Sequence, residues 1–262
     1  MRLKSAPRHF SHVNRGIGTQ VQWGLVCLQR ETWLVEAVFY ARSLAPDTQI
    51  EGVDLAEVLA FGDSLTWGAS PEFDGPRHDP DHRWPDVLQD SLEDVIIRCD
   101  GVRGRNTAYE NGASPAELNG ARSLPTALFA HAPLDAVILM LGTNDLLIGL
   151  TLPRVRAGLV RLVEIVKTTP LRVPGPAPAV LLVAPPTVRA MPGGYADAAA
   201  AKRSAGLAGV VQDVAQQERC ACFDAGTVCQ GAEPDGVHLS APDTRALGLS
   251  LASPVRDLLR SV

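Results

Sequence analysis

The 262 residues are 46% apolar and 20% charged, which is typical of a globular protein long enough to bury a full core. The net charge of −5, with scattered basic residues, gives no electrostatic footprint for nucleic acid. The longest apolar runs, 136–141 and 179–184, are far shorter than the roughly 20 residues of a membrane helix. We therefore expect one α/β domain that binds neither nucleic acid nor a membrane.

The first part of the chain, residues 1–54, forms an N-terminal extension of uncertain structure before a domain at 55–262. Arg2 and Lys4 are not followed by an apolar stretch with a small-residue cleavage site, so no secretory signal is expected. Residues 32–42 could form one amphipathic helix. Two interpretations stay open. The segment could be a loosely docked or disordered arm, or the product of translation from an upstream start. Alternatively, it could form an oligomer contact or a lid over the site.

Strands and helices alternate through the rest of the chain. Helical spacing of apolar residues predicts helices at 84–92, 153–167, 196–218 and 242–259. Apolar runs rich in β-branched residues predict strands at 57–61, 95–99, 136–141, 180–184 and 220–223. This order indicates a parallel sheet of about five strands with helices on both faces. Ligands of such sheets bind beyond the carboxyl ends of the strands.

Cysteine usage indicates a reducing compartment, and we expect a cytoplasmic protein. The count is odd, which argues against a disulfide framework: Cys27, Cys99, Cys220, Cys222 and Cys229. A zinc site built from the last three and His238 is disfavoured, because closed zinc sites favour spacers of two to four residues and Cys220 and Cys222 have only one between them. We expect no metal site.

Three short blocks carry the chemistry. They are FGDSLTWG at 61–68, LGTND at 141–145 and DGVHL at 235–239, each at or near the end of a predicted strand. Together they supply a hydroxyl, an amide donor, an imidazole and a carboxylate, the groups that nucleophilic acyl transfer needs. Each block alone is a weak signal, and the three in this order are a strong one.

These blocks make the chain resemble the SGNH, or GDSL, hydrolases, and within them the bacterial arylesterase/acyltransferase (perhydrolase) branch. The resemblance spans about 57–259 and includes RWP at 83–85, GVRGRNT at 101–107, NGAR at 119–122, HAPLDAVI at 131–138 and FDAG at 223–226. It implies a three-layer αβα, flavodoxin-like fold with strand order 2-1-3-4-5. It also implies a homo-oligomer with no cofactor.

Ser64 is the predicted nucleophile. It lies where a strand turns into a helix, and a helix N-terminus favours negative charge. Gly62 permits the tight turn there. The alternative, that Asp63 or Ser64 only caps the helix, would be preferred for an isolated Asp-Ser pair.

His238 is the predicted base and Asp235 its partner. The spacing of three residues lets one short turn bring the Asp235 carboxylate to Nδ1, which leaves Nε2 for Ser64. The alternative is a loop histidine that caps the last helix. We expect the other five histidines to lack such a partner.

The oxyanion hole is predicted from Ser64, Gly104 and Asn144. Asn144 would contribute its side-chain amide, and Ser64 its backbone N–H. The role of the Gly104 N–H is implied by the resemblance. Asn144 could instead be only a turn residue.

Other residues of these blocks are expected to have structural or substrate-binding roles. Asp63 and Asp145 are expected to cap or brace the loops. Arg105 is expected to pair with a carboxylate. Trp67 is a candidate substrate-binding residue that could equally pack under the first helix, and Thr143 is a candidate for shaping the channel mouth.

The leading hypothesis is a serine esterase for short-chain acyl and aryl esters, working through an acyl-serine and without a cofactor, with a small-molecule ester as its partner. Acyltransferase or perhydrolase activity is a further expectation, weakened by Ala69-Ser70 where some relatives have a second bulky aromatic residue. The segment 185–200 also looks shorter than in relatives. Alternatives within the fold are a carbohydrate O-deacetylase, a thioesterase or a lysophospholipase. A binding module would have lost a catalytic residue, and a flavin domain would need a phosphate-binding glycine loop after the first strand.

Overall fold

The computed structural model describes residues 55–73 and 75–261. The predicted N-terminal extension, residues 1–54, lies outside the described residues. Among the described helices, none combines the length and the apolar composition needed to cross a membrane.

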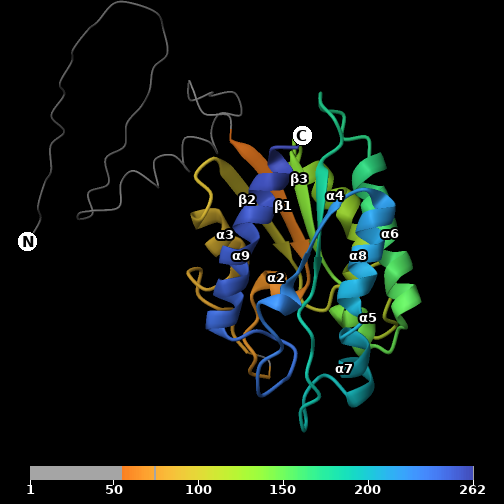
Figure 1. The fold of residues 1–262 in the computed structure, drawn as a ribbon. Coiled ribbons are helices and arrows are strands. Elements are labelled where there is room, and N and C mark those ends of the chain that lie inside the picture. The colour runs from red at the N-terminus through yellow and green to blue at the C-terminus, as the bar shows by residue number, and fades with distance from the viewer. Residues whose placement is uncertain (1–54, 74, 262) are drawn as a thin grey trace, which may run out of the picture. The chain divides into compact units, whose positions relative to one another are not determined.

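The core of the domain is a sheet of five parallel strands (Figure 1). In chain order they are β1 (Ala56–Gly62), β2 (Val95–Gly101), β3 (Ala136–Met140), β4 (Ala179–Ala184) and β5 (Ala221–Asp224). Their spatial order is β2-β1-β3-β4-β5. This is the order that the family resemblance implied, and each strand lies within two residues of its predicted ends. The order reverses at β1, which places the carboxyl ends of β1, β2 and β3 side by side.

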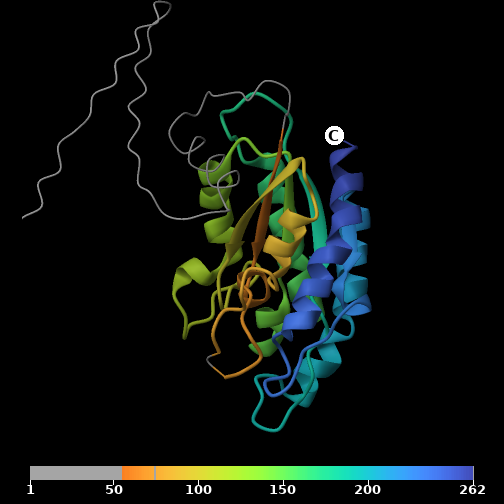
Figure 2. The ribbon, with the colours of Figure 1, turned by 90° about the vertical axis from the view of Figure 1, so that its left-hand side faces the viewer.

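Helices cover both faces of the sheet, as the three-layer prediction requires (Figures 1 and 2). Helices α3 (Trp84–Asp90) and α9 (Ala241–Leu259) pack on one face, over side chains such as Ala60 and Ile138. Helices α4 (Gly120–His131), α6 (Leu152–Thr168) and α8 (Leu207–Glu218) pack on the other. Successive strand residues point to opposite faces, so apolar residues are needed at nearly every strand position.

The structure corrects two of the helix predictions. The predicted helix 196–218 is two helices, α7 (Ala198–Ser204) and α8, separated at Ala205–Gly206. Their partners differ, because α7 packs against Val188 and Val237 near the sheet edge while α8 packs on the sheet itself. Helix α4 was not predicted. It contains Pro125, which removes one helical hydrogen bond and interrupts the helical pattern of the sequence.

Short helical turns follow the strands at the edge where the carboxyl ends lie. Helix α2 (Ser64–Trp67) begins two residues after the end of β1, and α5 (Thr143–Leu147) begins three residues after the end of β3. Two 3-10 turns, Ala116–Leu118 and Ala225–Thr227, lie in the connections after β2 and β5. These turns bring the three sequence blocks to one edge of the sheet.

Candidate active site

Ser64 is the first residue of α2, immediately after the turn that ends β1. A Cβ atom on Gly62 would overlap the Thr66 side chain, so glycine is needed where the chain folds back. Asp63 caps the helix, since its Oδ1 accepts a hydrogen bond from Leu65 N at 2.9 Å. Asp63 therefore takes the capping role that the sequence left open, and the Ser64 hydroxyl is free to point elsewhere.

Ser64, His238 and Asp235 form one chain of hydrogen bonds. Ser64 Oγ lies 2.9 Å from His238 Nε2, and His238 Nδ1 lies 2.6 Å from Asp235 Oδ2. Asp235 is fully buried, and Ser64 and His238 are each 6% exposed. With the carboxylate accepting from Nδ1–H, Nε2 is left to accept the serine proton. The predicted triad residues are thus in the geometry of a nucleophile, its base and the group that orients the base.

The Asp235–His238 loop is fixed by its own backbone. Asp235 Oδ1 accepts hydrogen bonds from Val237 N at 2.8 Å and His238 N at 2.9 Å. The segment after β4 adds two more bonds, from Arg189 N to Gly236 O at 2.7 Å and from Tyr195 N to Asp235 O at 3.1 Å. Four backbone N–H groups therefore hold the loop that carries the carboxylate and the imidazole in place before any substrate arrives.

One of the other histidines differs from the prediction. His82 does have a carboxylate partner, because its Nδ1 lies 2.9 Å from Asp81 Oδ1, but the two side chains are 37% and 73% exposed. His78 Nε2 lies 2.9 Å from the backbone oxygen of Leu239, the residue after His238. Neither contact includes a hydroxyl that could act as a nucleophile.

The predicted oxyanion donors lie around the same edge. Gly104 has a φ of +80°, which a residue with a side chain rarely adopts. In the part of the chain that the structure describes, the N–H groups of Ser64 and Gly104 donate to no other residue. Asn144 Nδ2 donates to Asp63 Oδ2 and to Arg105 O, both at 3.1 Å. Among the described residues, the N–H groups of Ser64 and Gly104 thus have no acceptor, whereas Asn144 Nδ2 already has two.

Buried charges brace these loops as the sequence predicted. Asp145 accepts from Thr107 N at 2.9 Å and from Thr107 Oγ1 at 2.6 Å, and burial raises its pKa. Arg105 donates to Asp100 Oδ1 at 2.7 Å and to Gly62 O at 2.8 Å, with its guanidinium 3.9 Å from the centre of the Phe61 ring. Loss of water around the fully buried Asp63 raises its pKa from 3.8 to about 6.

The two candidate substrate-binding residues differ in their surroundings. Trp67 is half-buried, and the guanidinium carbons of Arg77 and Arg103 each lie 5.4 Å from the centre of its indole ring. Thr143 is 3% exposed, and its Oγ1 has no hydrogen-bond partner among the described residues. The structure surrounds Trp67 with cations and places Thr143 in the interior.

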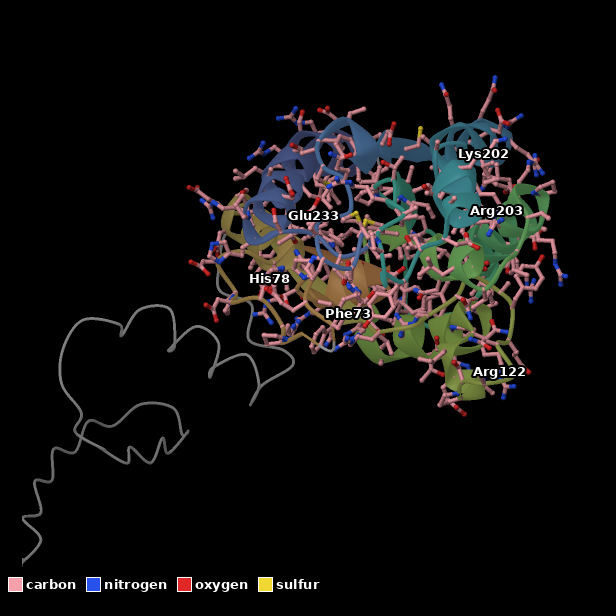
Figure 3. All side chains as sticks on the ribbon, turned by 90° about the horizontal axis from the view of Figure 1, so that it is seen from below. Phe73, His78, Arg122, Lys202, Arg203 and Glu233 are labelled. Carbon is pink, nitrogen blue, oxygen red and sulfur yellow. The ribbon has the colours of Figure 1, made fainter. Side chains whose placement is uncertain are left out.

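Two aromatic residues near His238 were missed by the sequence analysis. The Tyr195 and His238 ring centres are 6.0 Å apart, and those of Tyr195 and Phe73 are 5.3 Å apart, both pairs being edge-to-face. Figure 3 looks onto this edge of the sheet and shows Phe73 toward the middle of the face. Both residues lie in irregular loops far apart in the chain, and no motif or periodicity marks either one.

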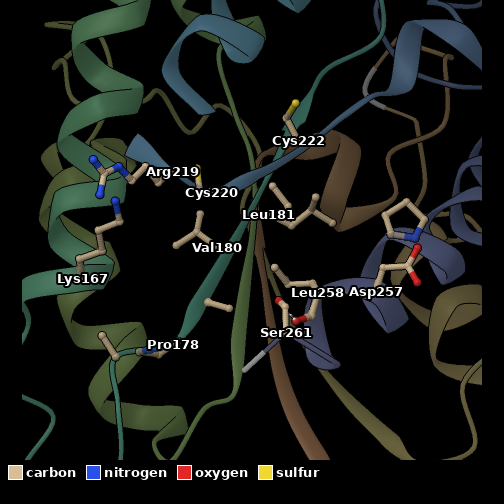
Figure 4. A pocket seen from close by; sticks show the side chains of 14 residues that line it. Lys167, Pro178, Val180, Leu181, Arg219, Cys220, Cys222, Asp257, Leu258 and Ser261 are labelled. Atoms are coloured by element: carbon tan, nitrogen blue, oxygen red, sulfur yellow. Dashed lines mark hydrogen bonds between the residues drawn. The ribbon is translucent and has the colours of Figure 1, made fainter. Parts of the chain in front are cut away.

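A cavity of about 710 Å³ lies elsewhere, beside the first halves of β4 and β5 (Figure 4). Its lining includes Lys167, Arg219, Cys220, Cys222 and Asp257, and no residue of the predicted site. Within the described ranges, no three His, Cys, Asp or Glu side chains are grouped so that they could hold a metal ion. The predicted chemistry therefore lies at one edge of the sheet and this cavity away from it.

The profile of the GDSL-like lipase/acylhydrolase family matches residues 60–244. The chain belongs to this family. Members of the GDSL family are acylhydrolases, and the chain is accordingly an ester hydrolase of the GDSL type. No curated protein sequence matches it.

Solved structures place this GDSL protein near the bacterial arylesterases. A candidate arylesterase from Agrobacterium tumefaciens is 44% identical, with a TM-score of 0.74, over 78% of this chain and 100% of its own. The aryl esterase of M. smegmatis is 38% identical, with a TM-score of 0.72, over 78% and 99%. A carbohydrate acetylesterase family member from Sinorhizobium meliloti is also 38% identical, with a TM-score of 0.75, over 79% and 100%.

Proposed function

We propose that this GDSL hydrolase is a serine esterase that cleaves short-chain acyl and aryl esters through an acyl-Ser64 intermediate. The observation that carries the proposal is the buried chain of hydrogen bonds from Ser64 Oγ through His238 to Asp235. A hydroxyl is a weak nucleophile at neutral pH, and an adjacent imidazole held by a carboxylate is the usual means of activating it.

In the first step, Ser64 Oγ attacks the carbonyl carbon of the ester while His238 Nε2 takes its proton. Asp235 keeps Nδ1 protonated and stabilises the imidazolium that forms. His238 then gives the proton to the leaving oxygen, and the bond between the carbonyl carbon and that oxygen breaks. The product of this step is an ester between the acyl group and Ser64.

The negative oxygen of the tetrahedral intermediate would be stabilised by the N–H groups of Ser64 and Gly104. Asn144 would be the third donor, and to act it must exchange one of its two 3.1 Å bonds for one to the substrate oxygen. Catalytic hydrogen bonds often tighten only when the substrate is bound. We infer that this exchange accompanies substrate binding.

Water, activated by His238, would then attack the acyl-Ser64 and release the acid. An alcohol in place of water would give transesterification, and hydrogen peroxide would give a peracid. None of these steps uses a metal ion or an organic cofactor. The groups required are Ser64, His238, Asp235 and the oxyanion donors.

Removal of acetyl groups from carbohydrates is a second candidate function. It is favoured by the similarity to two Sinorhizobium meliloti proteins described as carbohydrate acetylesterases, at 38% and 35% identity. The chemistry at Ser64 would be the same, and only the alcohol would differ. Acetylated sugars and aryl acetates assayed side by side separate the two candidates, because the preferred alcohol gives the higher kcat/KM.

The test of the proposal is p-nitrophenyl acetate turnover by the wild type and by Ser64→Ala, with circular dichroism spectra of both. We expect turnover in the wild type and a loss of at least a thousandfold in a folded variant. Equal rates in the two proteins would mean that Ser64 is not the nucleophile.

A further inference from the structure

We propose that Phe73 and Tyr195 form a binding surface for an aromatic alcohol portion of the ester, on the leaving-group side of the site. This assignment of the aromatic pair, Phe73 and Tyr195, rests on the proposed function, since a leaving group exists only if Ser64 attacks an ester. It names the two residues that would give this esterase a preference for phenol esters over esters of small aliphatic alcohols, which the triad does not determine.

The Phe73 and Tyr195 rings are exposed, and neither residue belongs to a core cluster. Phe73 is 47% exposed and Tyr195 is 43% exposed. They come from different loops, Phe73 from the connection between α2 and α3 and Tyr195 from the connection between β4 and α7. Their rings nevertheless meet edge-to-face at 5.3 Å, which leaves ring surface open to a ligand. An aromatic group could pack on this surface without any rearrangement of the core.

Tyr195 is fixed relative to the catalytic base. Its backbone N–H donates to Asp235 O at 3.1 Å, and its ring lies edge-to-face with the His238 imidazole at 6.0 Å between centres. Asp235 and His238 belong to the same short loop. The distance from the ring to the base is therefore set by a loop that the hydrogen bonds already hold, which is the condition for precise placement of a substrate group.

The position beside His238 identifies which part of the ester the pair contacts. His238 Nε2 must give its proton to the leaving oxygen, so that oxygen lies within hydrogen-bond reach of the imidazole. A ring attached to this oxygen extends past the imidazole, where Tyr195 and Phe73 lie. The carbonyl oxygen instead points to the N–H groups of Ser64 and Gly104, which belong to the loops after β1 and β2. The aromatic pair is thus assigned to the alcohol portion and not to the acyl portion.

The test compares three esters: phenyl acetate, ethyl acetate and methyl benzoate. The variants are Phe73→Ala, Tyr195→Ala and Tyr195→Phe, with circular dichroism on each. Phe129→Ala is the matched control, because Phe129 is 49% exposed and lies near the end of α4, toward the edge where β3 begins. The quantity compared is the ratio of kcat/KM for phenyl acetate to that for ethyl acetate. The intrinsic reactivity of each ester cancels when variants are compared with the wild type.

We expect Tyr195→Ala to lower this ratio about tenfold and Phe73→Ala to lower it several-fold, on the scale of aromatic stacking. Tyr195→Phe keeps the ring and should keep the ratio, as should Phe129→Ala. The ratio of methyl benzoate to ethyl acetate should stay within twofold of the wild-type value in all variants.

Two results would overturn the role assigned to the aromatic pair while leaving the esterase proposal intact. If Tyr195→Ala lowers kcat/KM for all three esters equally, Tyr195 supports His238 and does not select the substrate. If the substitutions lower kcat/KM mainly for methyl benzoate, the rings contact the acyl portion. Failure of the esterase proposal looks different, because the wild type would then turn over none of the three esters, or Ser64→Ala would turn them over as fast.

Discussion

Two buried carboxylates flank the Ser64–His238 pair, and their surroundings differ. Asp235 and Asp63 are both 0% exposed. Asp235 accepts three hydrogen bonds, from Val237 N, His238 N and His238 Nδ1. Asp63 accepts two, from Leu65 N and Asn144 Nδ2, and burial raises its pKa to about 6. Asp235 contacts His238, the proposed base, and Asp63 contacts Asn144, the proposed third oxyanion donor.

The comparison shows that residue type and burial do not decide what a carboxylate does in this site. A negative charge beside His238 stabilises the imidazolium that forms during catalysis. A negative charge at Asp63 lies near the group that must receive an oxyanion, where a second anion is unfavourable. We therefore expect the Asp235 side to govern the rate and the Asp63 side to govern both the orientation of Asn144 and the stability.

The largest expected effect is on the Asp235 side. Asp235→Asn keeps the shape but replaces an acceptor with a group that can donate to Nδ1, so the imidazole is held in the wrong tautomer. We expect kcat for p-nitrophenyl acetate to fall about 10⁴-fold. Steady-state kinetics with a circular dichroism control measures this. A loss smaller than tenfold would mean that the Asp235–His238 bond has no part in catalysis.

The next effect concerns the oxyanion donor that Asp63 holds. Asn144→Ala removes one of three donors, and the expected loss in kcat is about 10²- to 10³-fold with little change in KM. An unchanged kcat would show that the oxyanion rests on Ser64 and Gly104 alone and that Asn144 only fills the turn.

A smaller effect, on stability, is expected at Thr107, which holds Asp145, the residue after Asn144. Thr107→Val removes the 2.6 Å hydrogen bond to Asp145 in a fully buried pair. We expect the free energy of unfolding to fall by about 2 kcal/mol, since hydrogen bonds to charged groups contribute more than neutral ones. Urea unfolding measures this, with Thr126→Val on the exposed face of α4 as the matched control. Equal changes in the two variants would contradict the bracing role of Thr107.

The smallest expected difference between a variant and the wild type is at Asp63, and it depends on pH. A pKa raised from 3.8 to about 6 means that the folded state holds the Asp63 proton more tightly than the unfolded state. Stability is lost as pH rises between these two values, by about 3 kcal/mol in total, and the loss is complete above pH 6.

Asp63→Asn removes this loss and gives up one hydrogen bond of about 1 kcal/mol. The variant should therefore exceed the wild type by about 1 to 2 kcal/mol at pH 8, and near pH 4 it should have no advantage, because the lost hydrogen bond then outweighs the remaining gain. Unfolding free energies at pH 4, 6 and 8 measure the difference. An advantage that grows as the pH falls would contradict the account of Asp63.

Much of the fold could be predicted because buried parallel strands need apolar residues on both faces. The run 136–141 is an example, with β3 at Ala136–Met140. Helix α4 could not be predicted in this way, since Pro125 interrupts its pattern. The division of 196–218 into α7 and α8 depends on tertiary partners that a local pattern does not contain.

The triad could be predicted because its chemistry leaves a local pattern, with Asp235 three residues before His238 and Ser64 directly after a strand. The double use of Asn144 Nδ2 could not, because it depends on where Asp63 and the Arg105 carbonyl meet in space. Phe73 and Tyr195 were missed for the same reason, since only the folded chain brings them beside His238.

The central claim is that Ser64 is a nucleophile activated by His238. Its most direct test is labelling with a fluorophosphonate ester, followed by peptide mass spectrometry, on the wild type and on His238→Ala. The account predicts one phosphonyl adduct on Ser64 in the wild type and at least a hundredfold slower labelling in the variant. An adduct on another residue, or labelling of Ser64 at the same rate without His238, would contradict it.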